Sequence, residues 1–147
     1  MDTPIAPGRR SFAAAAAALA AAFVPAAARA QIAKPNRLLL QVSDADEGKW
    51  KLALTNAYNV LNGVAPDAAE IEIVVYGPGI GMLRRGSPVA ERVASAIGSG
   101  VRVVACQNTM DSEHLTPADM LPGIGYVQAA AVELMQRQQQ GYAYMHP

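Results

Sequence analysis

The stretch EIEIVVYGPGIG, residues 70–81, decides the fold class of this chain of 147 residues. Its first seven residues are rich in strand-forming side chains, and three closely spaced glycines follow them. Two other short apolar runs have the same character, LLLQV at 38–42 and VRVVA at 101–105. Continuous apolar strands are typical of parallel sheets that helices cover on both faces. Residues 70–81 therefore predict a buried parallel strand that ends in a turn.

Helical patterns separate these strands. Trp50, Leu54 and Leu61 recur at helical spacing after Ser43 and Asp44, either of which can cap such a helix. The other predicted elements are a helix from Ser87-Pro88 to Gly98, a polar loop after the third strand, a short helical turn from Thr116, a strand within 123–128, a helix over 129–140 and a strand at 142–145. This alternation predicts an α/β sandwich with a mostly parallel sheet of about five strands.

The first thirty residues have the organisation of an export signal. Arg9 and Arg10 precede an alanine-rich apolar run, and a small-x-small end at 28–30 predicts cleavage before Gln31. The arginine pair resembles a twin-arginine signal, which predicts a periplasmic protein whose α/β domain spans 31–147. The alternative is an uncleaved helix in a bilayer, although alanine-rich segments insert poorly. No transmembrane pattern follows Gln31, so no membrane association is expected after cleavage.

Composition excludes several classes of function. Lysine and arginine together equal aspartate and glutamate in number, and no basic stripe is present, so nucleic acid is not an expected partner. The single cysteine, Cys106, cannot form an internal disulfide. A zinc site would need more ligands than Cys106 and His114, and His146 is distant in sequence. Neither a metal nor a cofactor is predicted.

Unusual local sequences follow three of the predicted strands. Ser43-Asp44 follow the first strand, Gly77-Pro78-Gly79 the second, and Asn108-Thr109 come shortly after the third. The carboxyl ends of parallel strands meet at one edge of the sheet, where ligands bind in such folds. These residues therefore predict a ligand pocket at that edge. The glycines favour a tight strand-to-helix connection over a phosphate cradle, because the spacing lacks the dinucleotide fingerprint.

Cys106 stands at the end of its strand, and hydrogen-bonding residues follow it. Polar groups at this edge can stabilise a thiolate or a persulfide anion, which favours a reactive thiol. His114, eight positions later, is a candidate to activate the sulfur, with Asp111 or Glu113 orienting its ring. The alternatives are a buried, inert cysteine and an exposed loop histidine without a role.

Four segments together resemble the DsrE/DsrF-like proteins, some of which act in sulfur relay. They are LALTNAYNVLN at 52–62, EIEIVVYGPGIGML at 70–83, GVRVVACQNTM at 100–110 and QQQGYAYMHP at 138–147. The resemblance implies a three-layer α/β/α sandwich around a parallel five-stranded sheet. It also places Cys106 at the position that carries persulfide in relay members. The chain departs from those members in its export signal and in the residues that flank the cysteine.

Three functions remain open at this point. The first is a persulfide carrier or sulfurtransferase-like protein that acts through Cys106 and exchanges sulfur with a donor or acceptor protein. The second is a non-catalytic module that binds a small ligand or a partner, and the third is an oligomeric scaffold with an inert thiol. The resemblance implies a homo-oligomer, a trimer or a hexamer. Tyr142, Tyr144 and Met145 are candidate interface residues, because aromatic and methionine side chains are enriched at interfaces.

Overall fold

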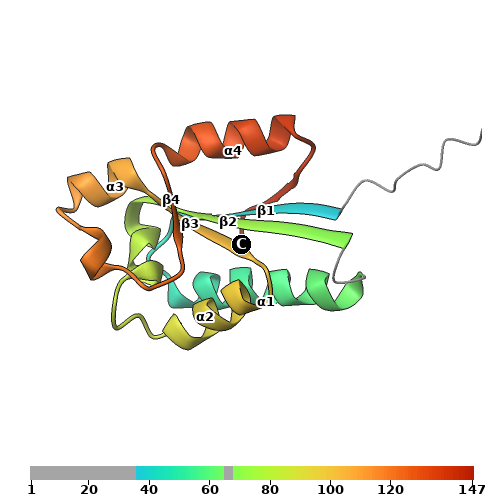
Figure 1. Cartoon of the computed structure of the whole chain (residues 1–147), viewed down its shortest axis with the longest axis horizontal. Coiled ribbons are helices and arrows are strands. Elements are labelled where there is room, and N and C mark those ends of the chain that lie inside the picture. Colours follow the sequence, from blue (N-terminus) through green and yellow to red (C-terminus); the bar gives the residue numbers. More distant parts are fainter. Residues whose placement is uncertain (1–35, 65–67) are drawn as a thin grey trace, which may run out of the picture. The chain divides into compact units, whose positions relative to one another are not determined.

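The computed structural model describes residues 36–64 and 68–147 (Figure 1). The predicted signal at 1–30 lies outside the described residues. The strands are β1 (Asn36–Val42), β2 (Ala69–Val75), β3 (Arg102–Cys106), β4 (Gly125–Val127) and β5 (Ala143–Met145). The α-helices are α1 (Glu47–Gly63), α2 (Ala90–Gly98), α3 (Gln107–Ser112) and α4 (Ala130–Gln139). The described residues also include the 3₁₀ helices η2 (Gly77–Leu83) and η3 (Pro117–Asp119).

The five strands form one sheet in the order β4-β3-β2-β1-β5. Every pairing is parallel, and the register aligns Leu38 with Ile71 and Glu72 with Arg102. The C-terminal strand β5 lies against β1, where Leu39 pairs with Tyr144. The predicted α/β fold with a five-stranded parallel sheet is confirmed.

Helices cover both faces of the sheet, as Figure 1 shows: α1 and α2 lie on one side and α4 on the other. The larger core joins α1 and α2 to the sheet and includes Leu40 and Ile73. The smaller core, under α4, consists of Leu39, Val74, Val104, Cys106, Ala130 and Leu134. Alternate residues of a strand point to opposite faces, so Cys106 belongs to the α4 side.

Helix α1 forms as its apolar spacing predicts, with Trp50, Ala53, Leu54 and Ala57 buried. Its cap was predicted wrongly. Asp46, and not Ser43 or Asp44, caps α1, because Asp46 Oδ1 accepts hydrogen bonds from the backbone N–H groups of Gly48 (2.6 Å) and Lys49 (3.3 Å). Asp44 holds the helix differently, since its carbonyl oxygen accepts the indole N–H of Trp50 at 2.7 Å.

Two other boundaries differ from the sequence prediction. Helix α2 begins at Ala90, because Ser87-Pro88 form a turn in which the Ser87 carbonyl accepts from the N–H of Ala90 at 3.0 Å. The segment after β3 is the helix α3, where the sequence predicts a loop. Within the ranges that the structure describes, no helix has the length and apolar character needed to cross a bilayer.

Candidate functional site

The carboxyl edge of the sheet brings the three predicted segments together. The N–H of Gly79 donates to the carbonyl oxygen of Ser43 (3.1 Å), and the N–H of Gly77 donates to Thr109 Oγ1 (3.0 Å). The turn after β2 is thereby fixed to the end of β1 on one side and to α3 on the other. Both glycine amides have protein partners, so this turn does not present them to a phosphate.

Close packing explains why the turn is rich in glycine. A Cβ atom on Gly79 would lie 2.6 Å from the carbonyl oxygen of Val42, closer than real contacts allow. Gly77 has a φ of +52°, a left-handed conformation that favours glycine. Pro78 between them is exposed. The glycines of this turn therefore serve a tight strand-to-helix connection.

Cys106 lies where β3, α3 and α4 meet. Its side chain is 5% exposed, and its Sγ accepts a hydrogen bond from the backbone N–H of Ala130 at 3.4 Å. The thiol in turn lies 3.8 Å from the carbonyl oxygen of Gln128, to which it donates. Ala130 is the first residue of α4, so the sulfur sits at the N-terminal end of that helix. Free N–H groups and the helix dipole favour negative charge at such a position.

A hydrogen-bonded pair of side chains lies beside the sulfur. Gln128 Nε2 donates to Asn108 Oδ1 at 2.8 Å, and the N–H of Asn108 donates to the carbonyl oxygen of Gln128 at 3.1 Å. Both residues are exposed. The same carbonyl oxygen accepts from the thiol, so the link between α3 and the loop before α4 forms the outer cover of Cys106.

His114 lies away from this arrangement. Its side chain is exposed at the end of α3, where its backbone has a φ of +55° and its N–H donates to the Asp111 carbonyl at 3.2 Å. Asp111 Oδ1 accepts from Gln107 Nε2 at 2.8 Å, and among the described residues no hydrogen bond joins the His114 ring to Asp111 or Glu113. Among the contacts of residues 36–64 and 68–147, none joins His114 to Cys106. The sulfur is thus held by backbone groups of the α4 side.

His146, the other histidine, lies at the carboxyl edge of the sheet, beside the predicted pocket residues Ser43 and Asp44. His146 Nε2 lies 3.5 Å from Asp44 Oδ2 and 3.5 Å from Ser43 Oγ. Lys49 Nζ also contacts Asp44 Oδ2 at 2.8 Å, and its hydrogen bond holds the pKa of Asp44 below the usual range. One imidazole nitrogen makes both histidine contacts, so Ser43, His146 and Asp44 do not form a catalytic triad, which needs both ring nitrogens.

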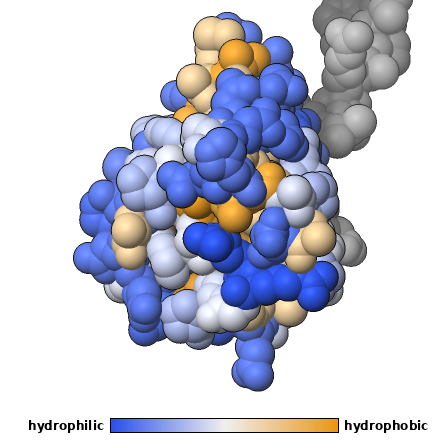
Figure 2. Space-filling view, turned by 90° about the vertical axis from the view of Figure 1, so that its left-hand side faces the viewer, coloured by the Kyte–Doolittle hydropathy of each residue, from blue (hydrophilic) through white to orange (hydrophobic). Residues whose placement is uncertain are grey.

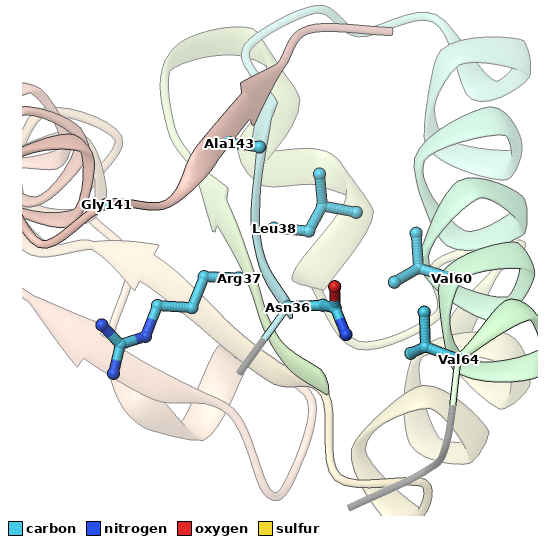
Figure 3. Close-up of a pocket in the computed structure, with 7 residues that line it drawn as sticks. All are labelled: Asn36, Arg37, Leu38, Val60, Val64, Gly141 and Ala143. Atoms are coloured by element: carbon cyan, nitrogen blue, oxygen red, sulfur yellow. The ribbon is translucent and has the colours of Figure 1, made fainter. Parts of the chain in front are cut away.

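Two larger pockets lie against the sheet, and a smaller one of about 240 Å³ is lined by Glu72, Arg102 and Arg137. A pocket of about 450 Å³ lies between the amino end of β1 and α1, where Leu38 faces Val60 and Val64 (Figure 3). A second pocket, of about 520 Å³, lies between β4 and α4. Its lining includes Gln128 and Ala129, the residues next to the Cys106 sulfur, together with exposed Tyr126. The second pocket therefore lies on the α4 side near the thiol, and Gln128 and Ala129 stand between the pocket and Cys106.

The surface around the carboxyl edge is mainly hydrophilic, with small apolar areas (Figure 2). Over the described part of the chain, no three His, Cys, Asp or Glu side chains gather in a way that could hold a metal ion. The chemistry that this edge offers is that of one thiol with a hydrogen-bond donor beside it.

Comparisons with known proteins place this arrangement in context. The model of the DsrE/DsrF-like family matches residues 7–147. The solved structure of a protein of unknown function from Methanobacterium thermoautotrophicum is 31% identical, with a TM-score of 0.72, and the match covers 76% of this chain and 98% of that chain. A protein of unknown function from Bacteroides thetaiotaomicron shares the fold at 15% identity and a TM-score of 0.63, covering 76% of this chain and 95% of its own. No curated protein gives a significant match.

Proposed function

Because the chain belongs to the DsrE/DsrF-like family, we propose that it is a sulfur carrier that holds sulfane sulfur on Cys106 as a persulfide. The observation that carries the proposal is the position of Sγ at the start of α4, 3.4 Å from the N–H of Ala130. A sulfur atom that accepts from a helix N-terminus is stabilised in its anionic form, which is the nucleophile. Cys106 has apolar neighbours in the small core under α4, and the backbone donor at its sulfur distinguishes it from a cysteine that only fills a core.

The chemistry requires no oxidant or reductant beyond the sulfur donor. The Cys106 thiolate attacks the terminal sulfur of a donor persulfide, R–S–SH. A new S–S bond forms on Cys106, the donor S–S bond breaks, and the donor leaves as the thiolate RS⁻ with the bonding electrons. An acceptor thiolate reverses these roles when it attacks the outer sulfur, and Cys106 leaves as thiolate. A single cysteine suits this cycle, since a second one nearby would capture the persulfide as a disulfide.

Access to the sulfur requires local opening, because Cys106 is 5% exposed. The contact between Asn108 and Gln128 joins two exposed side chains and is worth little free energy. Its opening would join the sulfur to the adjoining pocket of about 520 Å³, which has room for a donor or acceptor side chain. The cover therefore shields the persulfide between transfers.

Intact-mass spectrometry after incubation with polysulfide tests this proposal. The wild-type chain should gain the mass of one sulfur atom, and addition of a small thiol should remove it. Cys106→Ser is the control, and it should fold and show no gain. A wild-type chain that never gains sulfur from polysulfide or thiosulfate, which both supply sulfane sulfur, would favour the alternative of a non-catalytic binding module.

Export to the periplasm is part of the proposal, supported by the sequence of residues 1–30. Replacement of Arg9 and Arg10 together by lysine should retain the precursor in the cytoplasm. Export of that double variant at the wild-type level would contradict the twin-arginine assignment.

Assembly into a trimer or hexamer is also proposed. Tyr144 and Met145, on the edge strand β5, have exposed side chains, which is compatible with an interface. Light scattering at micromolar concentration measures the mass of the particle directly. A monomeric mass would contradict this part of the proposal.

A further inference from the structure

The pocket of about 520 Å³ between β4 and α4 extends along β3. Its lining includes Arg102, the first residue of β3, and Gln128, just beyond the end of β4. Val127, which also lines it, pairs with Cys106 at the end of β3. A parallel strand rises about 3.3 Å per residue, so the two ends of β3 lie about 13 Å apart. The pocket therefore reaches from the start of β3 to the level of the sulfur.

An ionic cluster stands at the end of the pocket that is distant from the sulfur. Arg102 Nη1 contacts Glu133 Oε1 of α4 at 3.3 Å and Oε2 of Glu72, a side chain 2% exposed, at 3.1 Å. Arg137 of α4 contacts the same two carboxyl groups, at 2.7 Å from Glu72 and 2.8 Å from Glu133. Two guanidinium groups thus share two carboxyl groups, and Arg102 and Glu133 are the members that line the pocket.

Arg102 keeps donors for a further partner. A guanidinium has five N–H groups in a planar fork, which matches the two oxygens of a carboxylate. Both of its carboxyl contacts use Nη1, and 45% of the side chain is exposed. Its Nε and Nη2 make no hydrogen bond within the described ranges. Because its partners also hold it in place, Arg102 presents the rest of the fork at little cost in side-chain entropy.

The walls between the two ends are apolar with a few amide groups. Tyr126 and Val132 line the pocket and have 40% and 45% of their surface exposed. Gln128 and Gln136 add amide groups that can donate to and accept from a peptide bond. Small-molecule sites have this composition, and they have volumes of about 300–1,000 Å³. The size and lining therefore suit a small ligand with an apolar and amide-bearing middle.

The chemistry of the two ends defines the class of ligand. Adjacent charges of opposite sign suit a zwitterion, with its carboxylate on Arg102 and its ammonium group on Glu133, since a carboxylate accepts about four hydrogen bonds. The other end lies beside Cys106, which calls for sulfur. A free cysteine persulfide is too short to span both ends, whereas a peptide-like thiol is long enough.

We propose that this pocket binds a low-molecular-weight, peptide-like persulfide of the glutathione type, with its amino-acid group on Arg102 and Glu133 and its sulfur toward Cys106. This inference names the donor class for the proposed function of Cys106 and rests on it. The transfer step is the one given above: the outer sulfur moves to Cys106, and the peptide thiolate leaves with the bonding electrons. The departing thiol has the same amino-acid group as the persulfide, so the pocket binds both.

An unreactive analogue separates binding from sulfur transfer. S-Methylglutathione has no thiol to exchange, and in the pocket it blocks the path by which iodoacetamide reaches the opened Cys106. The alkylation rate of the full-length chain should fall about tenfold when the analogue exceeds its Kd by a factor of about ten. S-Methylcysteine at the same concentration should leave the rate unchanged, because it cannot span the two ends.

Two substitutions on α4 form a matched pair. Val132→Glu places a bulky charge in the wall of the pocket and should abolish the protection, whereas Met135→Glu, at an exposed position outside the lining, should retain it. Each rate is divided by that of the same variant without ligand, and circular dichroism confirms the fold. Arg102→Lys keeps the charge but loses the fork, and it should raise the Kd of the analogue about tenfold.

Absence of protection in the wild type, or equal protection in Val132→Glu, would overturn the proposal. Equal protection by S-methylcysteine would do so as well, because the amino-acid group would then not be bound at Arg102. None of these measurements involves sulfane sulfur. A chain that binds the analogue but never gains sulfur would contradict the proposed carrier function, and a chain that gains sulfur from polysulfide without binding the analogue would contradict only the donor class.

Discussion

Substitution of Gly79 by alanine should destabilise the protein strongly. The added Cβ would lie 2.6 Å from the carbonyl oxygen and 2.9 Å from the carbonyl carbon of Val42, and 3.1 Å from Ser43 Cα. All three atoms belong to the backbone of one chain segment, so no side chain can rotate away to relieve the overlap. Overpacking of this kind costs about 1–3 kcal/mol. The hydrogen bond from Gly79 to the Ser43 carbonyl would also lengthen, at a cost of about 1 kcal/mol.

Thermal unfolding followed by circular dichroism measures the effect. A loss of about 3 kcal/mol in a domain of this size lowers Tm by roughly 10 °C. Gly98→Ala is the matched control, because nothing lies within 4 Å of a Cβ at that position in α2, and alanine there should be neutral or stabilising by up to about 1 kcal/mol. A Tm for Gly79→Ala equal to that of wild type would refute the packing explanation of the glycine turn.

Two further predictions concern the cover of the thiol and the buried carboxyl group. Gln128→Ala removes the donor to Asn108 and should raise the alkylation rate of Cys106 by about two- to fivefold, whereas Gln139→Ala, an exposed residue of α4, should not change it. The folded-state pKa of Glu72, about 7, lies above its usual value of 4.5, so the stability from its proton is complete below pH 4.5 and is lost as pH rises through 7. Denaturant unfolding should therefore show the wild type losing about 2–3 kcal/mol between pH 5 and pH 8 relative to Glu72→Gln. Parallel stability curves for the two proteins would show that Glu72 does not titrate in this range.

The sequence predicts those parts of the fold that arise from local patterns. The apolar runs at 38–42 and 101–105 are strands β1 and β3, and the spacing of Trp50 and Leu54 is the buried face of α1. The helix α3 was missed because its six residues bury only Met110, which leaves no periodicity to detect. The cap of α1 was misplaced because Ser43, Asp44 and Asp46 all have side chains that can cap a helix, and the residue types alone do not single out Asp46.

The features that the sequence could not predict depend on contacts between distant segments. His146 reaches Asp44 only because β5 pairs in parallel with β1 at the edge of the sheet. Glu72 lies in a strand that the sequence predicts to be buried, but the residue types do not show that Arg137 of α4 is its partner. The donor to Cys106 is a backbone N–H from Ala130, which leaves no signature in residue types. A charged residue in the central strand of a parallel sheet is the one signal that points to the cluster around Glu72.

The central claim is that Cys106 carries sulfane sulfur, and peptide-level mass spectrometry tests it most directly. The full-length chain is treated with polysulfide, alkylated briefly, digested and compared with an untreated sample. The account predicts that the peptide containing Cys106 carries one additional sulfur atom between the cysteine and the alkyl group. A peptide with only the alkylated thiol, under conditions in which a reactive small thiol becomes a persulfide, would contradict it.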